Sequence, residues 1–153
     1  MDLMTLESLL EHWMGHRHLS RRVAELFPAD QLFSFSIGGM RPFGALSAEM
    51  LMVLPTLRGI ATGEWKWQAE YAPSDKAELL AAWADCDAKI YELWAQITTE
   101  RMLAVEADNF FVEHPSSNLS KVLYWIDNEI HHRGQGYVYL RALGIEPPAF
   151  WER

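Results

Sequence analysis

The chain has 153 residues, half of them hydrophobic and seven of them tryptophan, so it carries enough apolar surface for a folded core, and pervasive disorder is excluded. Its 13 Lys and Arg residues against 21 Asp and Glu residues give a formal charge of −8, which argues against nucleic acid as a partner. The single cysteine, Cys86, excludes an intrachain disulfide and fits a reducing compartment, while no secretory leader or membrane-spanning stretch is recognisable. These properties predict one cytoplasmic domain over residues 1–153, with neither nucleic acid nor a membrane as its partner.

Apolar residues at helical spacing predict a first helix over residues 5–27, which Pro28 ends. Residues 29–40 contain glycine, serine and aspartate and are expected to form a loop. A second helix is predicted to begin near Pro42, with an apolar seam that alternates steps of three and four residues. The seam consists of Phe43, Leu46, Met50, Val53, Leu57 and Ile60. Pro55 lies inside this segment and predicts a kink rather than an end of the helix.

An aromatic loop over residues 63–73 is expected next, and Ser74 is the predicted N-cap of a third helix with an acidic first turn. The third helix has its own apolar seam, formed by Leu79, Trp83, Cys86, Ile90, Leu93 and Ile97. Two short apolar runs, at residues 102–105 and 110–112, then predict a short hairpin or an extended connection.

The fourth helix is predicted over residues 118–143, with Gly144 as its left-handed terminator. Apolar and aromatic side chains on both of its sides predict burial on both sides. One side carries Leu119, Leu123, Ile126, Ile130 and Tyr137, and the other carries Trp125, Asn128, His132, Gln135, Tyr139 and Leu143. Gly134 and Gly136 each cost about 1 kcal/mol inside a helix, so they predict close approach by a neighbouring helix or a ligand. Four long amphipathic helices joined by loops indicate an all-α four-helix bundle.

Two stretches of the chain resemble the DinB/YfiT-like family. The first is Glu129-Ile130-His131-His132-Arg133-Gly134-Gln135, followed by Tyr137, Tyr139-Leu140-Arg141 and Gly144-Ile145-Glu146-Pro147-Pro148, and the second is Arg41-Pro42-Phe43-Gly44-Ala45-Leu46. The resemblance implies a four-helix bundle of up-up-down-down type and a homodimer, a state that the many aromatic residues also favour. For many members it further implies a divalent zinc or nickel ion bound by three histidines, with thiol transfer or isomerisation as the reaction of some.

Carried over to this sequence, the family's ligand positions hold Glu49, eight residues after the motif's arginine, together with Asn128 and His132. The last two lie at i and i+4, so both side chains point the same way from the fourth helix. Glu49 lies on the flank of the second helix's seam and is expected to point toward them. Glutamate and histidine are ordinary metal ligands, whereas asparagine is a weak ligand for zinc or nickel. The predicted site therefore binds metal less tightly than three histidines would.

Two functions are expected as alternatives. In the first, a divalent metal at Glu49, Asn128 and His132 supports hydrolysis or thiol transfer on a small-molecule substrate, or Glu49 acts as a general base without metal. In the second, Glu49 accepts a hydrogen bond from His132 or Asn128. The chain is then a non-catalytic, stress-associated bundle, dimeric or ligand-binding, that has lost its metal site.

Other polar groups are interpreted as structural. The first helix carries a predicted solvated basic face, whose first two histidines offer an alternative metal pair and whose charge could attract an anionic group. This face comprises His12, His16, Arg17, His18, Arg21 and Arg22. His131 lies about 100° from His132 and is expected outside the ligand set unless the helix is rotated. Arg133 is expected to pair with an acid on another helix, and Cys86 to be a buried, unreactive thiol.

Overall fold

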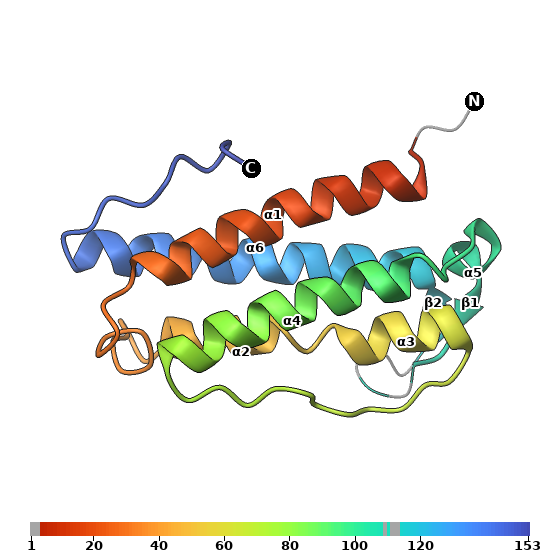
Figure 1. The fold of residues 1–153 in the computed structure, drawn as a ribbon, viewed down its shortest axis with the longest axis horizontal. Helices are drawn as coiled ribbons and strands as arrows, with labels where there is room; N and C mark the ends of the chain where they lie inside the picture. Colours follow the sequence, from red (N-terminus) through yellow and green to blue (C-terminus); the bar gives the residue numbers. More distant parts are fainter. Residues whose placement is uncertain (1–3, 109, 111–113) are drawn as a thin grey trace.

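The computed structural model describes residues 4–108, 110 and 114–153. Within them the chain forms a bundle of four long helical segments, with a short helix and a two-stranded ladder at one end (Figure 1). This architecture confirms the expected all-α fold. The elements are α1 (Leu6–Leu26), α2 (Phe43–Met50), α3 (Leu54–Thr62), α4 (Lys76–Trp94), α5 (Thr99–Leu103), β1 (Val105–Glu106), β2 (Ser116–Ser117) and α6 (Asn118–Ala142).

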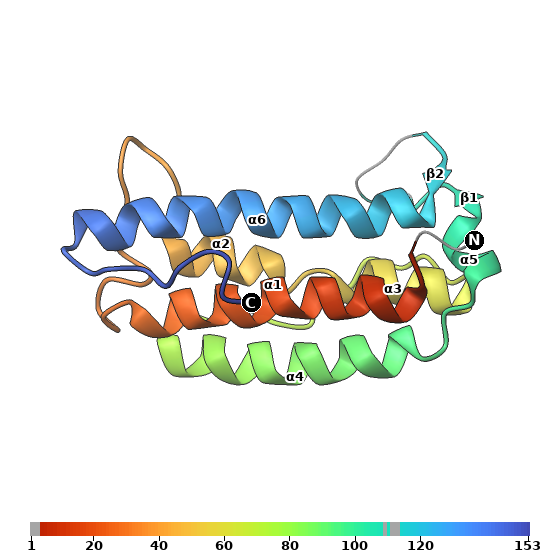
Figure 2. The ribbon, with the colours of Figure 1, turned by 90° about the horizontal axis from the view of Figure 1, so that it is seen from above.

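Helices α1 and α6 run in one direction, whereas α2, α3 and α4 run in the opposite direction (Figures 1 and 2). The expected up-up-down-down order is therefore wrong, and the order along the chain is up, down, down, up. The connections explain the difference. The loop after α1 reverses the chain, but the segment over residues 63–75 runs back along the bundle before α4 begins, so α3 and α4 point the same way.

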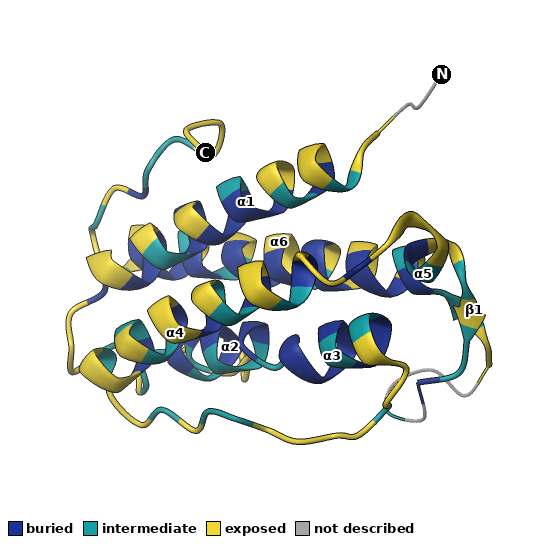
Figure 3. Cartoon of the chain, turned by 45° about the vertical axis from the view of Figure 1, so that its right-hand side comes forward, coloured by how far each residue is buried: buried dark blue, intermediate teal, exposed yellow. Residues whose placement is uncertain are grey.

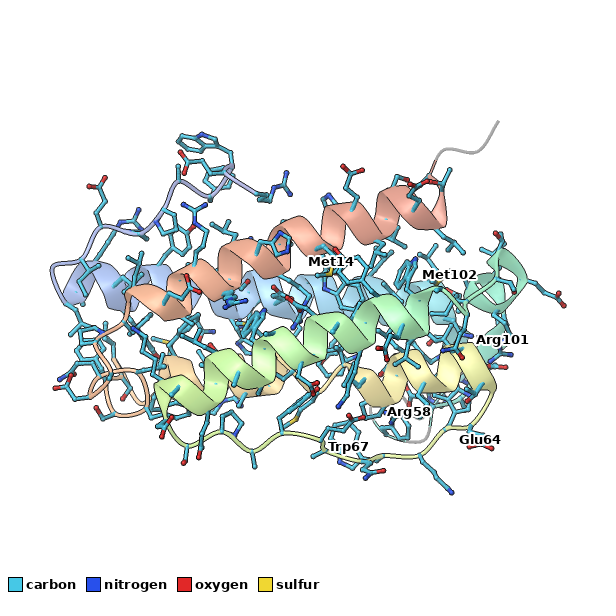
Figure 4. The ribbon with its side chains drawn as sticks, in the orientation of Figure 1. Met14, Arg58, Glu64, Trp67, Arg101 and Met102 are labelled. Carbon is cyan, nitrogen blue, oxygen red and sulfur yellow. The ribbon has the colours of Figure 1, made fainter. Side chains whose placement is uncertain are left out.

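Side-chain contacts fix this long crossover segment against the two helices that it connects. The carboxylate of Glu70 pairs with Arg58 of α3 and, at 3.1 Å, with Lys89 of α4. Figure 4 shows Arg58 and Trp67 on this side of the bundle, where the crossover passes α3. The segment is thus held by ion pairs at mid-length although it contains neither helix nor strand.

The core lies along the axis of the bundle, where the buried faces of the helices meet and the exposed faces point outward (Figure 3). All six residues of the seam predicted for the second helix are buried, which confirms that this segment belongs to the core. In α4 the buried seam residues are Leu79, Trp83, Cys86 and Ile90. Both apolar seams therefore contribute to one hydrophobic core.

The predicted second helix is divided into α2 and α3 by a turn over residues 51–53. Pro55 lies in the first turn of α3, and its missing N–H leaves the carbonyl of Leu51 without a helical partner. The Cys86 thiol donates a hydrogen bond to that oxygen at 3.8 Å, and Arg17 donates one to the Met50 carbonyl at 3.2 Å. The helix is thus interrupted at the place where a kink was expected. The interruption is tolerated because side chains from other helices donate hydrogen bonds to the carbonyl groups that lose their helical partners.

The stretch Phe43–Thr62, which comprises α2 and α3, is apolar and long enough to cross a membrane by composition and length, with a mean hydropathy of 1.2. However, 72% of its most apolar window is buried inside the bundle. Core helices of compact domains often pass the same test, and the burial assigns this stretch to the core.

The start of the third helix differs by one residue from the prediction. Asp75, not Ser74, is the N-cap of α4, because its side chain accepts a 2.8 Å hydrogen bond from the backbone N–H of Glu78. Ser74 instead contacts the Glu78 carboxylate through its own N–H and hydroxyl, at 2.9 Å each. Both residues therefore support the helix start, but aspartate occupies the capping position.

The predicted hairpin exists, but its strands are displaced along the sequence. In the structure β1 pairs antiparallel with β2, with Val105 opposite Ser117 and Glu106 opposite Ser116. Residues 102–103 belong to α5, and residues 111–112 lie outside the described residues. The N-cap at Thr98 begins a helix that extends to Leu103, so the first half of the apolar run at residues 102–105 is helical instead of extended.

Helix α6 ends as predicted, with Gly144 in the left-handed region at φ 77°. Its expected burial on both sides is wrong, because Leu123 and Ile130 are exposed. The other segments of the bundle pack against only one side of α6. Gly136 does provide the predicted close approach, since a Cβ built there would lie 2.4 Å from the ring of Phe43 in α2.

The contact between Gly136 and Phe43 generates a prediction about stability. Gly136→Ala forces Phe43 or α2 to move, so the free energy of unfolding should fall by about 1–3 kcal/mol despite alanine's better helix propensity. The matched control is Gly134→Ala, where a Cβ meets no other atom and the free energy should rise by up to about 1 kcal/mol. Urea denaturation at low protein concentration measures both changes, and equal effects of the two variants would contradict this packing.

Candidate functional site

Three side chains from two helices converge at the candidate site, as the sequence predicts. Glu49 Oε1 lies 3.0 Å from His132 Nε2 and 3.0 Å from Asn128 Nδ2. Asn128 Nδ2 lies 3.1 Å from His132 Nε2, which closes a triangle of polar atoms. The His132 side chain is 8% exposed and that of Glu49 27% exposed, so the triangle lies at the edge of the core.

Helix packing places these groups. Glu49 is near the C-terminal end of α2, and the other two lie one turn apart on α6. The contact of Gly136 with Phe43 holds the two helices close together. In addition, the Tyr139 hydroxyl donates a 3.0 Å hydrogen bond to the Arg41 carbonyl just before α2. The carboxylate is therefore carried to the imidazole by backbone packing rather than by a flexible loop.

Arg41 is a fourth member of the cluster, and the sequence argument missed it. Its Nη1 donates a 2.5 Å hydrogen bond to Glu49 Oε2, so both carboxylate oxygens have partners. The only sequence signal for this pair is a spacing of eight residues, about two helical turns. That signal is weak, because Arg41 precedes the first residue of α2.

Hydrogen bonds keep Glu49 ionised. Burial is the largest single influence on this group and raises its pKa, but the hydrogen bonds from His132, Asn128 and Arg41 together outweigh burial and lower the pKa to about 2. An efficient general base has a pKa near the working pH. Glu49 is accordingly a weak base at neutral pH.

The donor set of the cluster suits zinc or nickel poorly. It offers one carboxylate, one imidazole and one amide, and an amide is a weak ligand for these metals. Arg41 places a positive charge beside the carboxylate that a cation would need. Within residues 4–108, 110 and 114–153, no group of three or more His, Cys, Asp or Glu side chains is arranged to hold a metal ion.

The second ring nitrogen of His132 points to the same conclusion. His132 Nδ1 is buried without a hydrogen-bond partner in the described part of the chain. A metal-bound histidine usually donates its other N–H to a carboxylate, a carbonyl or water, which fixes the ring and strengthens the ligand. This supporting contact is missing here among the described residues.

The predicted solvated basic face of α1 is wrong for His16 and Arg17, which are buried, whereas His12, His18 and Arg22 are exposed as expected. Arg17 pairs with Asp87 of α4 and, at 3.5 Å, with Glu129 of α6. Its guanidinium also lies 4.9 Å from the centroid of the Trp83 ring. Position 17 faces the axis of the bundle, so its charge is neutralised by acids of two other helices instead of by water. This buried junction joins α1, α4 and α6.

His16 contacts two arginines rather than a metal partner. Arg133 Nη2 lies 3.0 Å from its Nδ1, and Arg153 Nη1 lies 2.9 Å from its Nε2. Burial first, and then the charges of these arginines, lower the pKa of His16 to about 4. Arg133 therefore does not form the expected ion pair with an acid on another helix. Its guanidinium contacts the His16 ring and donates a 3.0 Å hydrogen bond to the His16 carbonyl, because α1 presents these acceptors to α6.

The remaining candidates lie outside the cluster. His131 is exposed, and its Nε2 contacts Gln135 Nε2 at 3.0 Å. Cys86 is fully buried, and burial raises the pKa of its thiol to about 12, in agreement with the expected unreactive cysteine.

The lowered pKa of Glu49 predicts a pH-dependent stability. Because the folded-state pKa of about 2 lies below the ordinary value of 4.5, this carboxylate contributes stability at neutral pH that is lost as the pH falls from about 4.5 toward 2. Solvent screening of the partly exposed group reduces the contribution to about 1 kcal/mol.

Urea denaturation between pH 7 and pH 2 tests this expectation. Glu49→Gln should be less stable than the wild type at pH 7 and should lose less stability on acidification, whereas Glu11→Gln, on the exposed side of α1, should follow the wild type. A Glu49→Gln curve that runs parallel to the wild type through this range would contradict the strong hydrogen bonding of the carboxylate.

The buried junction generates a further prediction. Arg17→Met leaves Asp87 and Glu129 without their cation, so the free energy of unfolding should fall by about 3–5 kcal/mol. Arg21→Met breaks only an exposed pair with Glu25 and should change it by less than about 0.5 kcal/mol. Thermal and urea unfolding measure both. Similar small losses for the two variants would restore the solvated-face interpretation.

Comparisons with known proteins agree with this architecture. The DinB family model matches residues 1–153. None of the curated protein sequences compared with the chain matches it. A DinB-like protein from Bacillus cereus ATCC 10987 shares 17% identity at a TM-score of 0.74, covering 94% of this chain and 95% of that one. A DinB-like protein from Bacillus subtilis, YjoA, shares 18% identity at a TM-score of 0.75, and the match covers 95% of this chain and 99% of that one. These TM-scores show a common fold, and the full-length family match shows that the chain belongs to the DinB family.

Proposed function

We propose that this chain is a non-catalytic DinB-family bundle, in which Glu49, Asn128 and His132 form a hydrogen-bonded lock between α2 and α6 instead of a metal centre. The observation that carries the proposal is the saturation of Glu49. One oxygen accepts from the asparagine and faces the histidine, and the other is paired with Arg41.

This saturation argues against both catalytic roles of the carboxylate. A metal ion would have to displace Arg41 electrostatically and recruit an amide as its third ligand. A general-base role would need a pKa near 7, whereas the hydrogen bonds hold the pKa of Glu49 at about 2. The lock instead gives partners to the Glu49 carboxylate, to the Asn128 amide nitrogen and to His132 Nε2, and it fixes the separation of the two helices.

A second candidate is the metal-dependent hydrolase or thiol transferase implied by the family resemblance, acting on a small molecule. One observation favours it: the three polar atoms lie 3.0–3.1 Å apart, close to the spacing of ligands around a single ion. Asn128 Oδ1 is also buried without a partner in the described part of the chain. Turning the amide over would bring that oxygen into the triangle.

For both candidates we propose the cytoplasm as the compartment. The support is Cys86, which the fold keeps as a buried thiol that donates to the Leu51 carbonyl. A reducing environment preserves this contact.

Metal titration separates the two candidates. Wild-type protein purified without chelator should contain less than about 0.1 equivalent of zinc or nickel, and its melting temperature should not rise when either metal is added, because a ligand stabilises only the state that it binds. The double variant Glu49→His/Asn128→His supplies three imidazoles. Its melting temperature should therefore rise by about 5–10 °C when the metal concentration is a hundred times the metal's dissociation constant. If the double variant fails to fold, Asn128→His supplies two histidines and one carboxylate for the same comparison.

The opposite outcome is equally specific. A wild-type melting temperature that rises with zinc or nickel, and that no longer rises in His132→Ala but still rises in His12→Ala, would overturn the lock and establish the metal site. A rise abolished by His12→Ala alone would also overturn the proposal and would move the metal to α1.

A further inference from the structure

The segment that follows α6 turns back and forms a cleft together with the end of that helix. Gly144, at φ 77°, reverses the chain, and the Ile145 N–H donates a 2.9 Å hydrogen bond to the Leu140 carbonyl. Residues 145–153 then run back along the bundle toward α1 (Figure 2). The cleft between this segment and the last turns of α6 has a volume of about 620 Å³. Small-molecule sites measure about 300–1,000 Å³, so the cleft is large enough for one. We call it the C-terminal cleft, and its walls include Tyr137, Arg141, Glu146, Pro148, Phe150 and Trp151.

A contact with α1 and two prolines hold the wall of the C-terminal cleft in place. Arg22 of α1 donates a 3.0 Å hydrogen bond to the Glu152 carbonyl, and its Nη2 lies 3.5 Å from the Glu152 carboxylate. Pro147 and Pro148 restrict the backbone between α6 and this contact. A wall that is ordered before binding loses little conformational entropy when a ligand enters, so this arrangement favours binding.

Aromatic side chains form one wall of the C-terminal cleft. Phe150 and Trp151 are 66% and 70% exposed, the highest values among the large apolar side chains of the described residues. Their rings meet edge to face, with the centroids 5.3 Å apart. Apolar groups that gather exposed at a concave surface mark binding sites, and aromatic rings stack on other planar rings. This wall therefore suits a ligand that contains a planar ring.

Arg141 brings a positive charge to the helical wall of the C-terminal cleft. It lies one turn after Tyr137 on α6, and its guanidinium is 5.7 Å from the centroid of the Tyr137 ring. Among the described residues it pairs with no acid, although the chain as a whole carries a charge of −8. A guanidinium binds a carboxylate through two parallel hydrogen bonds. Arg141 is thus placed to bind an anionic group beside the aromatic wall.

The hydroxyl of Tyr137 adds a buried group that lacks a partner. Its oxygen is buried and makes no hydrogen bond in the described part of the chain. Burial raises the pKa of Tyr137, and the positive charges of Arg133, Arg22 and Arg141 oppose this rise, so three cations lie near the hydroxyl. A buried hydroxyl without a partner costs free energy. Rotation of the exposed Arg141 side chain would admit an anionic acceptor that satisfies it.

We propose that the C-terminal cleft binds a small aromatic carboxylate, a monoanion with one or two planar rings. Its carboxylate pairs with the Arg141 guanidinium and accepts a hydrogen bond from the Tyr137 hydroxyl, while its ring stacks on Trp151. Glu146 also lines the cleft and is exposed, so its negative charge disfavours ligands that carry more than one negative charge.

The two walls together select this ligand class over simpler ones. An inorganic anion such as phosphate would leave the aromatic wall without a contact, and a neutral ring would leave the guanidinium and the Tyr137 hydroxyl without an acceptor. Only a ligand with both a ring and a carboxylate uses both walls. The cleft shares no residue with the Glu49 cluster, so the proposal stands or falls independently of the lock.

Isothermal titration calorimetry with three probes tests the two walls separately. The wild type should bind naphthalene-2-carboxylate with a dissociation constant of about 0.1–1 mM. It should bind the neutral isostere naphthalene-2-carboxamide at least about fivefold more weakly, and phosphate not measurably up to about 5 mM, because each lacks one of the two recognised groups.

Three variants assign the contacts. Arg141→Gln should weaken binding of the carboxylate by about fivefold or more and leave binding of the carboxamide unchanged, because it removes only the cation. Trp151→Ala should weaken both ligands by about threefold or more, because both lose the stacking contact. Glu146→Gln should strengthen binding of the carboxylate by about twofold, because it removes a repelling charge, and a merely structural role of this wall would not produce that gain.

Matched controls lie on the crossover segment, on the other side of the bundle (Figures 1 and 4). Lys66→Gln removes an exposed cation and Trp67→Ala an exposed aromatic ring, and both variants should bind like the wild type, as should His132→Ala in the Glu49 cluster. Circular dichroism confirms that each variant is folded. A wild type that binds neither naphthalene ligand up to about 5 mM overturns the proposal. Equal affinity for carboxylate and carboxamide, phosphate binding as tight as that of the carboxylate, unchanged binding in Arg141→Gln, or lost binding in His132→Ala overturns it as well.

Discussion

The rotation of α6 about its own axis is the constraint on which the candidate site depends. It is fixed by the buried pairing of Arg17 with Glu129 and by the contact of Gly136 with Phe43. With this rotation, Asn128 and His132 face α2 and the carboxylate of Glu49. A turn of about 100° would present His131 instead, and the polar triangle would be lost.

Helix α6 thus distributes three different chemistries around one axis. One side is charged and buried against α1, a second is polar and faces α2, and the third is apolar and exposed. Burying an arginine and a glutamate is costly unless each finds its partner, so the first side resists any change of register. The polar triangle benefits from this rigidity, because its hydrogen bonds need fixed distances rather than a long reach.

The helices and the core could be predicted from the sequence because the three/four periodicity of the apolar residues is strong, as in the seam from Phe43 to Ile60. The convergence of positions 49, 128 and 132 was also accessible, since the i, i+4 spacing and the family resemblance place them together. The order of helix directions was not, because nothing in the composition of residues 63–75 marks it as a full-length crossover. The burial of Arg17 was missed for a related reason: its neutralising acids lie on other helices, far away in the sequence.

The proposed lock holds Glu49 through hydrogen bonds and an ion pair and binds no metal ion. Crystals grown from protein with excess nickel, examined by anomalous diffraction at the nickel edge, test it most directly. We expect no anomalous peak at the cluster, with Glu49 Oε1 still within hydrogen-bonding distance of both α6 side chains. An anomalous peak within about 2.2 Å of both Glu49 Oε1 and His132 Nε2 would contradict it.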